Sequence, residues 1–142
     1  MTAIRIAAVS GSLRASSINT ALLRTIASGA PEGVSVELVS LGALPLFNPD
    51  LEADLPEAVK VLRATIVAAD GVIVASPEYA HGISGVLKNA LDWLVGCEGV
   101  SGKPVLVLNA APRAHHAIAA LRETLSTMAA RTVAIRLIRR DA

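Results

Sequence analysis

The chain has 142 residues, of which 53% are apolar and only 2% aromatic, and its formal net charge is +1. This length suits one domain with an aliphatic core, and the small charge argues against a protein that coats nucleic acid. The apolar runs are short and the first strand begins almost at once, so we expect neither a membrane span nor a signal peptide. A single cysteine, Cys97, allows no internal disulfide and fits a reducing cytoplasm.

A buried strand is predicted at residues 4–9, and a serine-rich turn leads from it into a helix near Ile18 that Ser16 or Ser17 can cap. The side chains of Ser10, Ser12, Ser17 and Asn19 add hydrogen-bond donors to this turn, and Arg14 adds a charged one. Backbone N–H groups and the positive end of a helix dipole meet in such a turn, so we interpret it as a phosphate cradle. The alternative is an ordinary connection, rich in serine because serine caps helices.

The rest of the chain alternates strands with helices. Further strands are predicted at 34–39, 72–75, 105–108 and 132–138, and further helices at 56–69, after the cap Ser84, and at 116–130. The first, third and fourth strands are continuously apolar, as central strands should be, whereas the second and fifth alternate as edges can. We therefore predict one flavodoxin-like α/β domain over residues 1–142, a three-layer sandwich whose parallel five-stranded sheet has the order 2-1-3-4-5.

Ligands of such a sheet bind beyond the carboxyl ends of strands one and three, where the strand order reverses. The loop at 76–82 leaves strand three there, beside the phosphate cradle. Pro77 stiffens this loop, and Glu78 and Tyr79 can flank a flat ligand. A planar heteroaromatic group joined to a phosphate, as in FMN, would span both loops. Alternatively, Tyr79 only packs, which is the commoner role of a loop tyrosine.

Two motifs resemble those of the NADPH-dependent FMN reductase family, which includes quinone, azo-dye and chromate reductases. The first is Gly11-Ser12-Leu13-Arg14 with Ser17 and Asn19, and the second is Ser76-Pro77-Glu78-Tyr79 followed by Gly85, Leu87-Lys88-Asn89 and Leu91-Asp92-Trp93. The resemblance covers nearly the whole chain. It implies bound FMN, hydride uptake from NADPH or NADH, and a homodimer or homotetramer.

The resemblance also assigns roles to single residues. It places the FMN phosphate on Ser10, Ser12, Arg14, Ser17 and Asn19, and the isoalloxazine on Pro77, Glu78, Tyr79 and the backbone of Ala80. Family members often have asparagine where this chain has Ala80, so one side-chain donor near the ring is lost. The second-motif residues Lys88, Asn89, Asp92 and Trp93 are expected to be structural or interface residues.

No catalytic side chain is expected, because the flavin itself supplies the redox chemistry. No metal site is expected either: His115 and His116 open the fourth helix, but no third ligand follows at metal spacing. His81 either lines the acceptor side of the flavin or is a plain exposed loop histidine.

The sequence therefore predicts a cytoplasmic, FMN-dependent NAD(P)H oxidoreductase that passes electrons to a small acceptor such as a quinone, azo compound, chromate or free flavin. A non-enzymatic electron carrier of the flavodoxin type is one alternative, although such carriers tend to be strongly acidic. A flavin-free truncated relic is another, because family members usually add a final helix and this chain stops at Ala142. Without that helix we expect an open apolar sheet face and an obligate oligomer that covers it.

Overall fold

The computed structural model describes residues 3–111 and 113–133. Five strands form one sheet in the order β2-β1-β3-β6-β7: β1 (Ile4–Ser10), β2 (Val34–Val39), β3 (Gly71–Ala75), β6 (Pro104–Leu108) and β7 (Arg131–Val133). Every neighbouring pair in it is parallel. This confirms the predicted order 2-1-3-4-5, with β6 and β7 as the predicted fourth and fifth strands. Residues 134–138, which the prediction added to the fifth strand, lie outside the described residues.

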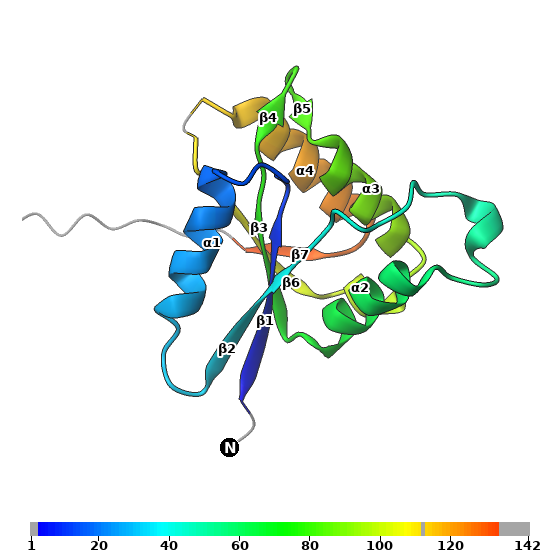
Figure 1. Ribbon diagram of the computed structural model, residues 1–142, viewed down its shortest axis with the longest axis horizontal. Coiled ribbons are helices and arrows are strands. Elements are labelled where there is room, and N and C mark those ends of the chain that lie inside the picture. Colours follow the sequence, from blue (N-terminus) through cyan, green and yellow to red (C-terminus); the bar gives the residue numbers. More distant parts are fainter. Residues whose placement is uncertain (1–2, 112, 134–142) are drawn as a thin grey trace, which may run out of the picture.

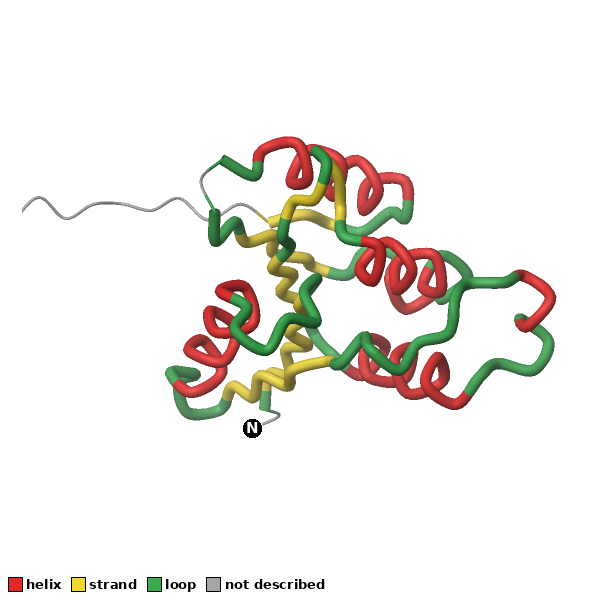
Figure 2. The backbone as a smooth tube through the Cα atoms, turned by 45° about the horizontal axis from the view of Figure 1, so that its top comes forward, coloured by secondary structure: helices red, strands yellow, loops and turns green. Residues whose placement is uncertain are grey.

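The crossovers between strands carry four helices: α1 (Ile18–Ser28), α2 (Glu57–Ala68), α3 (Gly85–Leu94) and α4 (His115–Thr127). Single 3₁₀ turns occur at Pro49–Leu51 and Glu98–Val100. Figure 1 and Figure 2 show α1 on one side of the sheet, with α2, α3 and α4 on the other. Among the described residues, no helix combines the length and the apolar character that a bilayer crossing requires.

The helix ends follow local chemistry. Ser17 caps α1 by accepting a hydrogen bond from the Thr20 amide at 3.2 Å, and Ser84 caps α3 in the same way, so both predicted caps are confirmed. Pro56 precedes α2 as its N-cap residue instead of entering the first turn as predicted. The prediction also extended α4 to residue 130. Ala129 has a φ of +58°, which no right-handed helix accommodates, so the helix stops at Thr127.

The two faces of the sheet are packed unequally. Towards α2, α3 and α4 the strands bury a continuous aliphatic core: Ala7, Val9, Val72, Val74 and Val105. Towards α1 the buried cluster, as far as the described residues show, contains only Ala8, Leu23 and Ala75. Ile73 and Leu108 stay half-buried on that face. Within the described residues, the core on the α1 side of the sheet is therefore smaller than the core on the other side.

Candidate functional site

Two loops meet beyond the carboxyl ends of β1 and β3, at the point where the strand order reverses. The Gly11 amide donates to the Ala75 carbonyl at 2.8 Å, which extends the β1–β3 pairing by one residue. The buried hydroxyl of Ser84 donates to the Gly11 carbonyl at 2.6 Å. These two bonds tie the loop after β1 to the segment that follows β3.

Gly11 allows this close approach. A Cβ built on it would lie 3.0 Å from Cδ of Pro77 and 3.1 Å from Oγ of Ser84, tighter than ordinary van der Waals contact. The sequence identified Gly11 only as the first residue of a family motif. It did not reveal this packing role, because the contact joins segments far apart in the chain. The absence of a side chain at this position therefore allows the two loops to lie this close together.

Hydrogen bonds between residues 10–20 hold the loop after β1 in shape. Oγ of Ser10 lies 2.8 Å from Oγ1 of Thr20 and accepts a bond from the Ser12 amide at 3.2 Å. Oγ of Ser12 in turn accepts a bond from the Arg14 amide at 3.3 Å. Ser17 is buried as the α1 cap. The predicted serines are thus brought together, and their hydroxyls hold the loop in shape.

Several polar groups in this loop have no hydrogen-bond partner among the residues that the structure describes. Within the described residues, the amides of Ile18 and Asn19 donate no hydrogen bond, as is usual for the first turn of a helix, and neither does the amide of Ser16, which precedes the cap. Oδ1 of Asn19 is buried without a partner, and Arg14 is exposed and forms no described ion pair. Free amides, a helix N-terminus and an uncommitted arginine form a suitable anion site.

A cavity of about 280 Å³ opens beside this loop. Ser10, Ser12 and Arg14 line it, whereas Ser17 and Asn19 do not. Its walls also include three polar residues that sequence reasoning missed: Thr20, Arg24 and Ser40. Thr20 and Arg24 are four residues apart in α1, so their helical spacing was the signal that could have placed them on one face.

The loop after β3 forms a small hairpin that the sequence did not reveal. Its strands, β4 (Glu78–Tyr79) and β5 (Gly82–Ile83), pair in antiparallel fashion. Ala80 and His81 form the two-residue turn with φ values of +48° and +61°. Such turns favour asparagine and glycine at these positions, so the pair Ala-His gives no turn signal. Tyr79 stands on this hairpin with 58% of its surface exposed.

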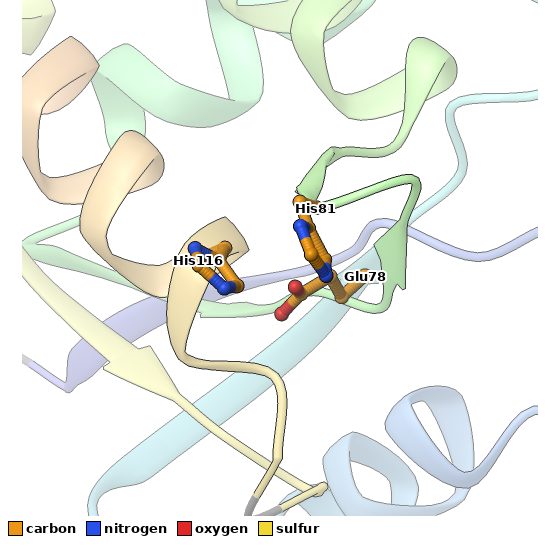
Figure 3. Close-up of side chains that lie close together, drawn as sticks. All are labelled: Glu78, His81 and His116. Atoms are coloured by element: carbon orange, nitrogen blue, oxygen red, sulfur yellow. The ribbon is translucent and has the colours of Figure 1, made fainter.

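The hairpin rests on the N-terminus of α4. Oε2 of Glu78 accepts a long hydrogen bond, 3.4 Å, from the Ala117 amide, and the His81 ring stacks on the His116 ring with centroids 4.1 Å apart. Figure 3 shows Glu78, His81 and His116 side by side. The sequence offered no third ligand beside His115 and His116, but the fold brings Glu78 and His81 within 4.8 Å of His116.

Two of the second-motif residues have structural roles, as predicted. Asn89 donates to the Pro45 carbonyl at 2.9 Å and accepts from the Phe47 amide at 2.7 Å. The fully buried Trp93 donates to the same Pro45 carbonyl at 2.8 Å. These bonds anchor the loop after β2. Lys88 and Asp92 form an exposed ion pair along α3.

Comparison with known proteins identifies relatives over most of the chain. The sequence profile of the family described as NADPH-dependent FMN reductase matches residues 4–137. A 2-hydroxy-1,4-benzoquinone reductase from a Burkholderia species is 42% identical over 109 residues, which are 75% of this chain and 60% of the relative. An NAD(P)H-dependent FMN reductase from Pseudomonas aeruginosa is 42% identical over 110 residues, again 75% and 60%.

A solved structure agrees with these relatives. FerB from Paracoccus denitrificans, described as a flavoenzyme NAD(P)H:(acceptor) oxidoreductase, superposes with a TM-score of 0.82 at 33% identity. The match covers 93% of this chain and 76% of FerB. The chain therefore spans about three fifths of the length of the two curated relatives and about three quarters of FerB.

Proposed function

Because the chain belongs to the NADPH-dependent FMN reductase family, we propose that it binds FMN and passes electrons from NADPH or NADH to a small-molecule acceptor such as a quinone. The observation that carries this proposal is the meeting of two loops at the sheet's switch point, one rich in free donors and the other a hairpin with an exposed tyrosine. Ligands of open α/β sheets bind at that point.

The loop after β1 suits the phosphate end of FMN. The amides of the first turn of α1 and the guanidinium of Arg14 are its uncommitted donors, so we assign the phosphate to them. Ser10, Ser12 and Ser17 then act chiefly by holding the loop in shape, since their hydroxyls already have protein partners. Oδ1 of Asn19 has no partner among the described residues, so it would be free to accept a hydrogen bond from bound FMN.

The hairpin suits the isoalloxazine ring. We assign ring contacts to Pro77, the side chain of Tyr79 and the backbone of Ala80. We assign Glu78 a positioning role, because its carboxylate is directed at the Ala117 amide of α4 and so holds the hairpin against that helix.

FMN, when bound, supplies the hydride and electron chemistry of the reaction. The protein's part is to hold the ring, fix its orientation and limit its contact with water. No side chain of the chain is assigned as a nucleophile or as a proton carrier. The acceptor would lie against the ring, where the exposed Tyr79 can border it.

We also propose that the protein is cytoplasmic and assembles as a homodimer or homotetramer. The lone Cys97 supports the first point. The second rests on the uneven packing of the sheet, where a groove beside α1 is lined by aliphatic residues such as Ile26, Val36 and Ile73. A second copy that covers this groove would remove apolar surface from water.

The phosphate assignment can be tested by titrating the protein with FMN and following quenching of flavin fluorescence. Arg14→Ala should weaken FMN binding by roughly 1.5–3 kcal/mol if the guanidinium makes a charged hydrogen bond to the phosphate. Arg122→Ala removes the same charge from an exposed position on α4 and should leave the affinity unchanged. Equal FMN affinity of the wild type and Arg14→Ala would refute the phosphate assignment. No FMN binding by the wild type would instead favour a flavin-free protein.

A further inference from the structure

We propose that Glu78, His81 and His116 form a binding site for a divalent transition-metal cation of the Zn²⁺ type, which would link the β4–β5 hairpin to α4. Their ligand atoms, two imidazole nitrogens and one carboxylate oxygen, all lie within 4.8 Å of one another. They come from two separate segments of the chain, as Figure 3 shows. The site does not depend on FMN, so it can be tested independently of the proposed function.

The donor set points to the class of ion. Imidazole nitrogen suits Zn²⁺, Cu²⁺ and Ni²⁺, whereas Mg²⁺ and Ca²⁺ prefer oxygen ligands. Two histidines and one glutamate form a known zinc ligand set, with a fourth position left to water. Ligand atoms around a tetrahedral zinc with bonds of ~2.1 Å lie about 3.4 Å apart, so the present set needs only a small closure of its side chains.

The three side chains are free to bind an ion. In the part of the chain that the structure describes, neither the His81 ring nor the His116 ring forms a hydrogen bond, and Glu78 forms no ion pair. Glu78 uses Oε2 for its long contact with the Ala117 amide, which leaves Oε1 uncommitted. Within the described residues, an ion would therefore displace no ion pair and no hydrogen bond of these side chains other than the long Glu78–Ala117 contact.

The backbone holds the ligands near one another before any ion arrives. His116 lies in the first turn of α4, and Glu78 lies on β4, paired with Ile83 of β5. His81 occupies the tight turn of the same hairpin, three residues after Glu78. Preorganisation of this kind lowers the entropy that binding must overcome.

The local electrostatics set a limit on affinity. The N-terminus of α4 carries the positive end of a helix dipole, which opposes a cation. The carboxylate of Glu78 supplies the opposing negative charge. We therefore expect an affinity weaker than that of a buried structural zinc site.

His115 offers a matched control. It neighbours His116 in the sequence, and the two rings lie at a tilt of 35° with centroids 4.2 Å apart. Its Nδ1 lies 3.1 Å from the Arg113 carbonyl oxygen, and it is not among the three clustered ligands. A general affinity of exposed histidines for metal would depend on both residues. A defined site would depend on His116 alone.

The test is isothermal titration of the tag-free, chelator-stripped full chain with ZnCl₂, with and without FMN present. We expect one Zn²⁺ per chain, at least tenfold weaker binding in His116→Ala and in His81→Ala, and no more than a twofold change in His115→Ala. His81 is exposed in a turn, so its variant should fold even if the α4 variant does not. Absent or non-stoichiometric binding by the wild type, or an equal loss in His115→Ala, would overturn the proposal.

Discussion

Gly11→Ala should destabilise the protein through the contact that joins the two loops of the candidate site. The new methyl group would lie 3.0 Å from Cδ of Pro77, 3.1 Å from Oγ of Ser84 and 3.3 Å from Cδ2 of Leu87. Overpacking costs about 1–3 kcal/mol, and loss of the hydrogen bond from Ser84 to the Gly11 carbonyl costs about 1 kcal/mol. The free energy of unfolding should therefore fall by about 2–4 kcal/mol. FMN affinity should fall too, because both loops must shift.

Urea unfolding followed by circular dichroism measures the first effect, and FMN titration measures the second. Gly85→Ala is the control: it adds the same methyl group at the start of α3, where a Cβ would meet no atom within 4 Å. That variant should be as stable as the wild type or gain up to about 1 kcal/mol, because alanine favours helix over glycine. Wild-type stability and FMN affinity in Gly11→Ala would refute the account of how the loops meet.

Two further predictions concern the same loops. Ala80→Gly should raise the free energy of unfolding by about 0.5–1 kcal/mol, because glycine takes the φ of +48° without the Cβ penalty that alanine has there; a lower urea midpoint would contradict this. Ser17→Ala should cost about 0.5–2 kcal/mol through loss of the α1 cap. The neighbouring Ser16→Ala, on an exposed side chain, serves as its control, and equal urea midpoints for the two variants would count against the cap.

Much of the fold was readable from the sequence because its signals are local. The apolar run of β3 and the alternation of β2 identified central and edge strands, and Ser17 and Ser84 marked the starts of their helices. These features depend on residues within one element. The order of the strands in the sheet followed from the alternation of strands with helices along the chain, because that alternation allows few topologies.

What the sequence did not show depends on contacts between distant segments. The hairpin β4–β5 has strands of two residues, too short for any periodicity, and its turn lacks the usual residues. The direction of Glu78 towards α4 and the packing of Gly11 against Pro77 join segments dozens of residues apart. Motif matching therefore found the loops, while the partners of their individual side chains required the structure.

The central claim, electron transfer through FMN from a nicotinamide to a small acceptor, is tested most directly by one anaerobic experiment. The protein is reconstituted with FMN, freed of excess flavin, and mixed with NADPH or NADH while its visible spectrum is recorded. We predict that the flavin absorbance bleaches and returns when benzoquinone is added. A protein-bound flavin that stays oxidised under excess NADPH and NADH would contradict the proposal and favour an electron carrier.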